Sequence, residues 1–593
     1  MRSDAKRPPG WGMLFVGMSL LCAAGAVLAG DFGMTYVKTI GQVCPALPMV
    51  TGGGRISVDE RGFLYFGTPG PNSFLQKMAP DGRVVWRADN THCSYTGTAV
   101  DDKYVYGCGI GYYGYGHLLR RKKESGVDAP GWVFVWPKAT DVVNGVRGFV
   151  SPGALKVDGT YLYILDIGNG ELRRLDKVSG VEKPFASPIK VEDANDFAIA
   201  NSGSLLVLAK DSVSEFDRAT GRSLRPKMIA GLQGAIAMAV NRQSGALFIG
   251  EGGTPEKSIN KIRIFSSAGA DTGTTIGRGG EWQGKWNADA FCFSCGGADI
   301  AFDLNGGFWS NCYAHRSDRL ALMTHFSPAY KPDKVFLGTV GESVAADGDL
   351  SAYVGGNYKI DWDGNLCWTS GLVNTGKPNQ FPTTLGGWSM KALYADAQRA
   401  IFTMVHHTKF VMVNPETGEG TGKEVAVPGN GIIGACVSGR YIYATNGTTV
   451  YRTTIDLTPL ETIFPVPDVV KAKGVTGMAL NTDQTIIYLS AGTGDNAMVY
   501  AFDGGGKRWE AKAGQIFTRY RGVLLTGNPA GPGLLALNAD DGSLNGIFAN
   551  KALDDRPQLW GISGAGVGSK DGADYLFVAA QYRVLVYRIA AGE

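Results

Sequence analysis

Four residues near the middle of the chain have the spacing of a zinc site. Cys292 and Cys295 are separated by two residues, and Cys312 and His315 repeat this spacing. Three thiolates and one imidazole can hold zinc tetrahedrally. The segment between the two pairs, "DIAFDLNGGFWSN", has the pattern of a β-hairpin with its turn at the Asn-Gly dipeptide. This hairpin would bring both ends of the motif together, and a Cys3His zinc site is one interpretation.

A disulfide is the other interpretation of this hairpin, and the one that we favour. With the turn at Asn-Gly, facing residue numbers add up to about 611, so Cys312 would face Asp299 and Cys295 would lie near His315. A Cys295–Cys312 or a Cys292–Cys312 disulfide would fit this geometry. Outside the N-terminal apolar segment the chain has eight cysteines, and an even number in an exported protein favours disulfides over thiolate ligands.

A second cysteine pair lies on another predicted hairpin. The stretch "HCSYTGTAVDDKYVYGC" has its turn at Asp101-Asp102, which puts Cys93 and Cys108 on facing strands with a small offset. We expect a Cys93–Cys108 disulfide at the outer end of this hairpin.

A tyrosine-rich loop, "GIGYYGYGH", follows this hairpin directly. Exposed tyrosines combine an apolar ring with a hydroxyl group and suit the binding of sugars or protein surfaces. The predicted binding residues are Tyr112, Tyr113, Tyr115 and His117. A packed insertion between structural units is the alternative.

The N-terminal segment predicts export. Arg2, Lys6 and Arg7 precede the apolar stretch "WGMLFVGMSLLCAAGAVLA", and small residues end it at Ala29. This is the plan of a signal peptide at residues 1–29. An uncleaved membrane anchor is the alternative. No later segment is long and apolar enough to span a membrane, so we expect a secreted or periplasmic protein.

The composition fits a large globular protein. Of the 593 residues 44% are hydrophobic and 19% are charged, which allows an extensive core and more than one domain. The formal net charge is only +3, with both signs well mixed. Because nucleic-acid binding depends on clustered positive charge, we do not expect a nucleic-acid partner.

One phrase recurs along the chain and predicts an all-β fold. Examples are "RISVDERGFLYFGT" from Arg55, "ALKVDGTYLYILD" from Ala154 and "GACVSGRYIYATN" from Gly434. Each has two β-rich runs around a polar turn, the signal of a hairpin. A second hairpin phrase often follows, such as "VSEFDRATGRSL" or "LLALNADDGSLNG". Two hairpins make a four-stranded blade, and their repetition predicts a β-propeller.

The number of repeats favours two tandem propellers of six or seven blades. We count about twelve units, whereas a single ring normally has four to eight blades. The predicted domains are an N-terminal propeller at residues 30–332 and a C-terminal propeller at residues 333–593, divided near "SPAYKPDKVFLG". One eight-bladed ring with long insertions is the alternative.

These repeats resemble known propeller families. "ISVDERGFLYFGT" with "LQKMAPDGRVVW" resembles the NHL and SMP-30-like repeats, and "FDGGGKRWEAKAG" and "LNADDGSLNG" resemble repeats of quinoprotein alcohol dehydrogenases. The first resemblance implies a lactonase or hydrolase with a divalent cation in one central channel, held by residues from different blades. The second implies a quinone-dependent oxidoreductase, although the adjacent Cys-Cys pair of those enzymes is absent. Propellers have many unrelated functions, so the likeness implies the fold more strongly than an activity.

Few motifs point to catalysis. The sequence has no GxSxG, HExxH or P-loop motif, and without CxxCH we expect no covalent haem. Asp361, Asp363 and Asn365 alternate as in a calcium loop, but Leu366 stands at the expected glycine position, so an Asp-Gly turn is favoured. Calcium and zinc remain open as cofactors. We expect a binding or scaffold protein that presents loop surfaces to a glycan or an envelope protein, with the two enzyme classes as alternatives.

Overall fold

The computed structural model is an all-β protein. It describes residues 33–40, 55–67, 74–89, 94–110, 116–136, 138–254, 257–280, 284–285, 288–289, 291, 293, 299–313, 320–339, 343–354, 358–369, 392–396, 399–403, 408–429, 431–531, 533–548, 562, 564–580 and 583–590. Short helical turns in these ranges include α1 (Asp468–Lys471) and η4 (Gly494–Asn496). None of the helices described is long and apolar enough to cross a membrane.

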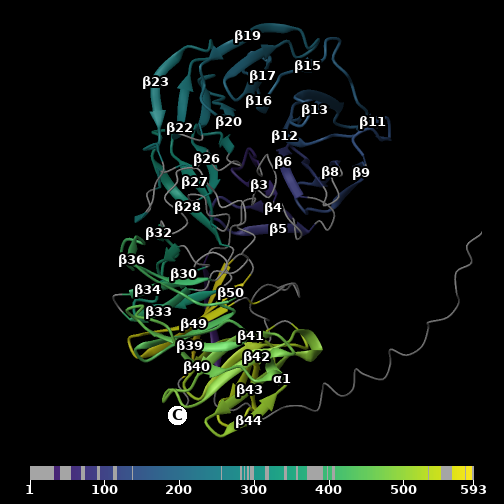
Figure 1. Ribbon diagram of the computed structural model, residues 1–593. Coiled ribbons are helices and arrows are strands. Elements are labelled where there is room, and N and C mark those ends of the chain that lie inside the picture. The colour runs from purple at the N-terminus through teal and green to yellow at the C-terminus, as the bar shows by residue number, and fades with distance from the viewer. Residues whose placement is uncertain are drawn as a thin grey trace, which may run out of the picture.

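The first six four-stranded antiparallel sheets form one closed ring (Figure 1). In chain order the blades are β2 (Ile56–Val58), β3 (Leu64–Gly67), β4 (Phe74–Met78) and β5 (Val84–Asp89); β6 (Ser94–Val100), β7 (Tyr104–Ile110), β8 (Gly116–Lys122) and β9 (Asp128–Trp136); β12 (Pro152–Val157), β13 (Tyr161–Asp166), β14 (Glu171–Asp176) and β15 (Ile189–Lys190); β16 (Ala194–Ile199), β17 (Leu205–Ala209), β18 (Ser212–Phe216) and β19 (Ser223–Ala230); β20 (Ala235–Val240), β21 (Leu247–Gly253), β22 (Ser258–Phe265) and β23 (Asp271–Ile276); and β25 (Asp299–Phe302), β26 (Phe308–Tyr313), β27 (Leu320–Phe326) and β28 (Pro332–Thr339). The small hairpin β10 (Val142–Val143) and β11 (Val146–Arg147) lies between the second and third blades. The first strand of each blade contacts the first strand of the next, and β25 contacts β2, which closes the ring.

Six further sheets form a second closed ring. They are β29 (Val344–Ala346), β30 (Ala352–Val354), β31 (Tyr358–Ile360) and β32 (Leu366–Thr369); β33 (Ala392–Asp396), β34 (Arg399–Thr403), β35 (Lys409–Val413) and β36 (Gly420–Ala426); β37 (Gly434–Ser438), β38 (Tyr441–Thr445), β39 (Thr449–Thr454) and β40 (Glu461–Pro465); β41 (Val475–Leu480), β42 (Ile487–Ala491), β43 (Met498–Asp503) and β44 (Gly506–Ala511); β45 (Ile516–Tyr520), β46 (Val523–Gly527), β47 (Leu534–Asn538) and β48 (Leu544–Phe548); and β49 (Gly564–Lys570), β50 (Ala573–Ala580) and β51 (Arg583–Ile589), completed by β1 (Met34–Ile40). Here β29 contacts both β33 and β49, so the ring closes. The expectation of two tandem propellers of six or seven blades is confirmed, with six blades in each ring.

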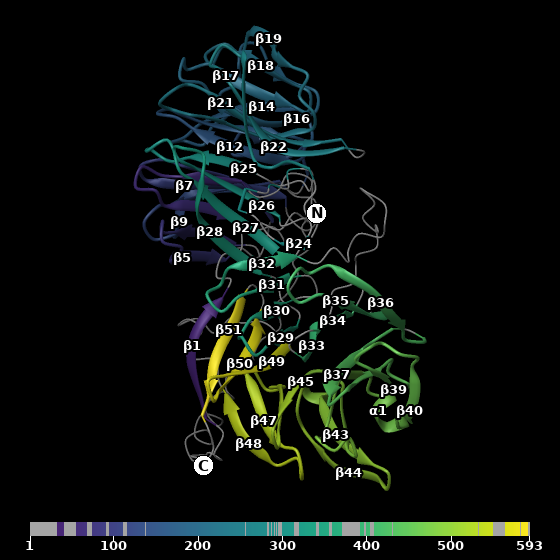
Figure 2. The same cartoon turned by 90° about the vertical axis from the view of Figure 1, so that its left-hand side faces the viewer.

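Two strands from sequence before or within the first ring pair with sheets of the second ring and join the two rings. β1, which precedes the first ring in sequence, pairs antiparallel with β51 as the outermost strand of the last blade of the second ring. In return β24 (Gly284–Lys285), between β23 and β25 of the first ring, adds a fifth strand next to β32. Figure 2 shows β1 beside β51 and β24 beside β32.

The ring boundaries therefore differ from the expected domain boundaries. The expected division after residue 332 falls at the start of β28, which pairs with β27 and belongs to the first ring. The N-terminal range expected to start at residue 30 includes β1, a strand of the second ring.

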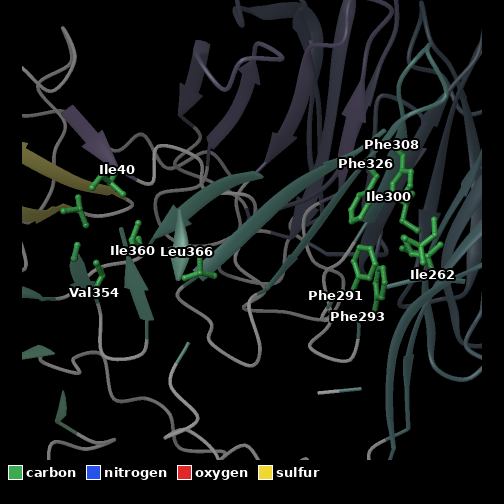
Figure 3. Packing of buried hydrophobic residues seen from close by; sticks show 14 of the residues in the cluster. Ile40, Ile262, Phe291, Phe293, Ile300, Phe308, Phe326, Val354, Ile360 and Leu366 are labelled. Carbon is green, nitrogen blue, oxygen red and sulfur yellow. The ribbon is translucent and has the colours of Figure 1, made fainter. Parts of the chain in front are cut away.

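Apolar residues from both rings contribute to the largest core cluster. Figure 3 shows Phe308 and Phe326 stacked in the sixth blade, with ring centroids 4.7 Å apart, and Ile40 of β1 near Ile360 of the second ring. All four side chains are almost fully buried. Burial on this scale is the main favourable contribution to the stability of the fold.

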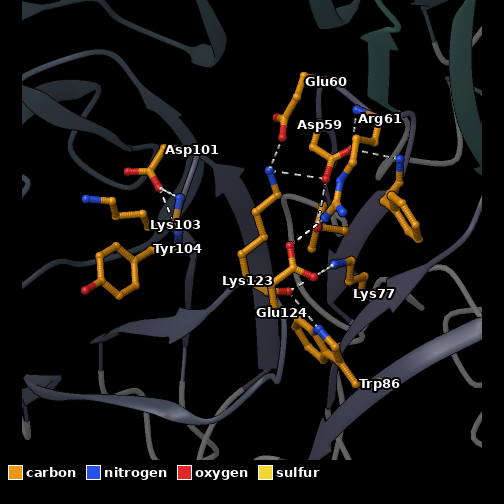
Figure 4. Close-up of polar contacts among 12 residues, drawn as sticks. Asp59, Glu60, Arg61, Lys77, Trp86, Asp101, Lys103, Tyr104, Lys123 and Glu124 are labelled. Atoms are coloured by element: carbon orange, nitrogen blue, oxygen red, sulfur yellow. Dashed lines mark hydrogen bonds and ion pairs between the residues drawn. The ribbon is translucent and has the colours of Figure 1, made fainter.

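A recurring aspartate fixes the turn after the inner strand. Asp59 accepts hydrogen bonds from the Phe63 amide at 2.9 Å and the Tyr65 hydroxyl at 3.0 Å, and Lys123 of the next blade reaches it at 3.3 Å (Figure 4). The same hydroxyl–carboxylate bonds join Tyr106 to Asp101, Tyr163 to Asp158 and Tyr353 to Asp347. These aspartates belong to the phrases that predicted the blades, and they explain why the phrases recur.

A recurring tryptophan wedges neighbouring blades together. The Trp86 Nε1–H donates to the Lys123 carbonyl at 2.9 Å, and the Trp368 Nε1–H donates to the Pro415 carbonyl at 2.7 Å. Each indole lies over a glycine of the turn in the next blade. Gly126 and Gly418 have φ of +70° and +72°, and a Cβ there would lie 2.7 Å from Trp86 and 2.3 Å from Trp368. Glycine meets both the backbone and the space requirement of this turn.

Candidate functional site

The predicted cysteine–histidine site lies mostly outside the described residues. Cys292, Cys295 and His315 are not described, and only the backbone of Cys312, in β26, is. The structure changes the expected register: Asp299 pairs with Asn311, so facing residue numbers add up to 610. The turn is one residue longer than a two-residue Asn-Gly turn, and Gly306 has a φ of +86°. A slip of one residue moves side chains to the opposite face of a sheet.

The predicted Cys93–Cys108 disulfide is not formed in the structure, where Cys108 is a free thiol. Cys93 lies outside the described residues. Cys108 faces Gly97 across the β6–β7 ladder, and its Sγ fills the space that the missing Cβ of Gly97 leaves. Burial raises the pKa of this thiol to about 12. The side chain points into the core between the second and third blades, away from the hairpin end at which a disulfide was expected.

The predicted tyrosine surface is only partly tested. Tyr112, Tyr113 and Tyr115 lie outside the described residues. His117 lies in β8, opposite Gly109 and Val135, and is 4% exposed. His117 is therefore a buried strand residue and is not available on a loop surface.

The Asp361 turn has the hydrogen bonds of an ordinary Asp-Gly turn. The Asn365 amide donates to Asp361 Oδ1 at 2.8 Å, and the Asn365 side-chain nitrogen donates to Oδ2 at 3.1 Å. Gly364 has a φ of +91°. The Lys38 ammonium of β1 donates to the Trp362 carbonyl and lies 3.8 Å from the centre of the indole. Among the residues described, no group of three His, Cys, Asp or Glu side chains is placed to hold a metal ion.

Arg55 occupies the axis of the first ring. It directly precedes β2 and is 3% exposed. Its Nη1 lies 2.7 Å from Asp196 Oδ2 in the fourth blade and 3.4 Å from Asp299 Oδ1 in the sixth. Nε donates to the Gly153 carbonyl of the third blade at 3.3 Å, and Nη2 donates to carbonyl groups of Asn195 in the fourth blade and Ile236 in the fifth.

The backbone of Arg55 completes the set of contacts. Its amide donates to the Thr96 carbonyl of the second blade at 3.2 Å. Arg55 therefore contacts all five other blades of its ring. Only a residue at the centre of the ring can do so, because the inner strands surround the axis.

The two carboxylates join the blades in the same way. Asp196 Oδ2 accepts the Met238 amide of the next blade at 2.8 Å, and Asp299 Oδ2 accepts the Ile56 amide of the first blade at 2.9 Å. Burial raises the pKa of Asp196, and the charge of Arg55 opposes this effect. Two carboxylates from different blades thus converge at the axis. With the guanidinium paired to both of them, this set does not fit the divalent cation that the SMP-30-like resemblance implied.

The axis of the second ring is open. Ser343, which directly precedes β29, stands at the position that Arg55 holds before β2. A cavity of about 310 Å³ lies at the axis and is lined by all six inner strands, β29, β33, β37, β41, β45 and β49. Its volume is at the lower end of the range of small-molecule sites.

The wall of this cavity is polar and nearly neutral. Val344, Met478 and Ile516 of the inner strands line this cavity and also belong to the apolar cores between blades. Each inner strand ends its sheet and is paired along one edge only, so the peptide groups of the other edge face the axis. None of the described lining residues has a carboxylate, and Arg519 is the one charged side chain among them.

Sequence reasoning found neither Arg55 nor the cavity. Arg55 was visible as the first letter of a repeat phrase, but its six partner residues come from five blades and share no sequence motif. The one signal available was a charged residue at this position of the repeat in Arg55, Asp196 and Asp299, where the other repeats of the first ring have Gly97, Ala154 and Ala237.

Comparisons with known proteins give no family. No family model matches the chain, and no curated protein matches it. Solved structures do resemble it. One is the crystal structure of a protein of unknown function from Bacteroides caccae, with a TM-score of 0.28 and 14% identity over 37% of this chain and 79% of that chain.

Proposed function

We propose that this protein is an exported carbohydrate-binding protein of two propellers, which holds its ligand without transforming it. The observation that carries the proposal is the wall of the open axis in the second ring. Its described residues offer peptide donors and acceptors, hydroxyl groups and an amide, and none of them has a carboxylate. Sugars present many hydroxyl groups and no net charge, and such groups are recognised through hydrogen bonds of this kind.

The contacts of His325 in the first ring support binding over catalysis. His325 is 9% exposed, and both its ring nitrogens contact carboxylates, Asp333 at 2.5 Å and Asp303 at 3.0 Å. The Trp309 ring lies 4.8 Å from the imidazole, centroid to centroid. A general base needs a nitrogen that can reach the substrate, and here both nitrogens are already engaged in the fold.

A glycan array with the purified full chain tests the proposal. We expect retention of a defined subset of glycans, and the same glycans recovered with their mass unchanged after incubation. A parallel assay offers lactones with calcium and a redox dye with a quinone. Turnover in either assay without glycan retention would contradict the proposal and favour one of the enzyme classes.

A further inference from the structure

The first ring shows which groups its inner strands bind at the axis. Arg55 contacts four backbone carbonyl groups there, and each belongs to the extra residue of a β-bulge in an inner strand. These residues are Thr96, Gly153, Asn195 and Ile236. A bulge leaves its extra residue outside the ladder, so its carbonyl group can point to the axis. The first ring therefore uses its bulge carbonyl groups to accept N–H donors.

The second ring repeats two of these bulges, in the same blades. Its fourth and fifth inner strands, β41 and β45, have their extra residues at Thr476 and Phe517. The fourth and fifth inner strands of the first ring have theirs at Asn195 and Ile236. The β45 bulge lies in the wall of the axial cavity, which includes Phe517 and both of its neighbours in sequence. The second ring therefore keeps part of the carbonyl set that Arg55 uses in the first.

A glycine lies beside the β45 bulge in the preceding blade. Gly477 follows the bulge of β41, and a Cβ there would lie 2.7 Å from the Ile516 carbonyl oxygen. In the first ring a Cβ on Gly97 would lie 3.0 Å from the Gly153 carbonyl oxygen, which accepts from Arg55. The bulge carbonyl group faces the preceding blade in both cases. Glycine within a strand often marks a place where a ligand or another backbone approaches closely.

Two positions near the axis bear on the charge of the donor. In the first ring Asp196 follows the bulge of the fourth blade and Asp299 begins β25, and both carboxylates pair with the axial guanidinium. In the second ring Gly477 follows the bulge of the fourth blade and Gly564 begins β49. A buried cation without a counter-ion is costly. These positions therefore favour a neutral donor, such as a hydroxyl group, over a guanidinium or an ammonium.

We infer that the axial cavity of the second ring binds a neutral hexose, with two neighbouring hydroxyl groups donating to the bulge carbonyl groups of β41 and β45. These hydroxyl groups take the place of the guanidinium N–H groups of Arg55, because Ser343 at the corresponding position has a side chain too short to reach across the ring. The cavity volume of about 310 Å³ suits a single sugar ring. This inference rests on the proposed carbohydrate-binding function and names the site, the sugar class and the contacts. The hexose can be a free sugar or the end of a glycan, since both present the same ring.

Titration calorimetry with the full chain tests the inference from the side of the ligand. The probes are glucose, mannose and galactose, and we expect at least one of them to bind. In the sugar that binds, each hydroxyl group is then replaced in turn by fluorine, which cannot donate a hydrogen bond. Replacement of each of two neighbouring hydroxyl groups should weaken binding about tenfold or more. Methylguanidinium is the cationic probe and should bind more weakly than the hexose.

Ser343→Gln tests the inference from the side of the protein. Its longer side chain brings amide N–H donors toward the bulge carbonyl groups, so hexose binding should weaken about tenfold or more. Arg452→Gln, on strand β39 and outside the inner strands, is the matched control and should bind like the wild type. Circular dichroism checks that each variant is folded. If Ser343→Gln does not fold, the fluorinated sugars with the wild type decide the question.

The outcomes separate this inference from the function on which it rests. If glycans are retained on the array but no neutral hexose binds, or if fluorine and Ser343→Gln leave binding unchanged, the site is wrong and the function stands. Tighter binding of methylguanidinium than of any hexose would overturn the neutral donor. If neither the array nor the titration gives binding, both the site and the function are wrong. A tetrasaccharide that ends in the same hexose distinguishes the sources, because tighter binding than the free sugar indicates a chain end.

Discussion

The inner strand of the first blade follows Arg55 in one ring and Ser343 in the other. From equivalent positions the arginine reaches every other blade of its ring, whereas the serine lines an open cavity. The blades themselves are alike, with the same turn aspartates and the same tryptophan wedges. The comparison teaches that the blade repeat builds both rings, while a filled axis and an open axis differ in the residues at and before the inner strands.

The largest effect should come from removing the guanidinium at the axis of the first ring. Arg55→Met leaves two buried carboxylates without their cation, which costs about 3–5 kcal/mol of unfolding free energy. Urea unfolding followed by tryptophan fluorescence measures this loss. Arg452→Met removes an exposed ion pair with Glu461 and should cost less than about 1 kcal/mol. A loss as small as that for Arg55→Met would mean that the axial network is not structural.

Removing the tryptophan wedge should affect the two rings alike. Trp86→Ala in the first ring and Trp368→Ala in the second each leave a cavity under a turn glycine, which costs about 3 kcal/mol. Thermal unfolding of both variants gives the comparison. If the two losses of unfolding free energy differed by more than about 2 kcal/mol, the blades of the two rings would not be equivalent. The axes would then not be the main difference between the rings.

Removing a tyrosine hydroxyl gives a smaller effect that depends on its partner. Tyr163→Phe breaks a bond of 2.9 Å to the Asp158 carboxylate and should cost about 1.5–3 kcal/mol. Tyr443→Phe breaks a bond of 2.7 Å to the neutral Gln484 side chain and should cost about 0.5–1.5 kcal/mol. Urea unfolding of both variants under identical conditions tests this. The reverse order would contradict the role given to the turn aspartates.

The smallest expected difference between the two rings is in their stability at acidic pH. Seven described carboxyl groups of the first ring have a pKa below the ordinary value: Glu60, Glu124, Asp176, Asp211, Glu215, Asp217 and Asp271. In the second ring the described groups with a lowered pKa are Asp541 and Asp574. These groups have a lower pKa in the folded state than in the unfolded chain, so the unfolded chain binds protons more tightly. Their contribution to stability is therefore present near neutral pH and is lost as the pH falls.

We therefore expect the first ring to lose its protection from hydrogen exchange before the second ring does, as the pH falls below about 4.5, the ordinary pKa of glutamate. Asp196 acts in the opposite direction, because burial raises its pKa, but it is one group against seven. Hydrogen exchange at a series of acidic pH values, read by ring, tests this order. Salt weakens exposed ion pairs, so added salt should reduce the difference.

The sequence predicts the blades well because each blade is a local structure. The turn aspartate and the next tyrosine are close in sequence, as Asp158 and Tyr163 are, so a short phrase carries the whole interaction. The expected hairpin register around Asn305 was wrong by one residue, since an extra turn residue with positive φ is not visible in composition.

The axes could not be predicted because their contacts are not local. Arg55 and Asp299 are 244 positions apart, and they meet only once the ring has closed. The same holds for β1, whose sequence reads as an ordinary strand and whose partner β51 lies at the other end of the chain. Tyr112, Tyr113 and Tyr115 lie outside the described residues, so the predicted loop surface stays a prediction.

The most direct test of the difference between the rings is hydrogen–deuterium exchange of the wild type and Arg55→Met, read by peptide. We predict faster exchange in all six inner strands of the first ring, β2, β6, β12, β16, β20 and β25, with β33, β37, β41 and β45 of the second ring unchanged. Unchanged exchange in the first ring, or an equal increase in both rings, would contradict the claim that Arg55 makes the axis of the first ring a structural core.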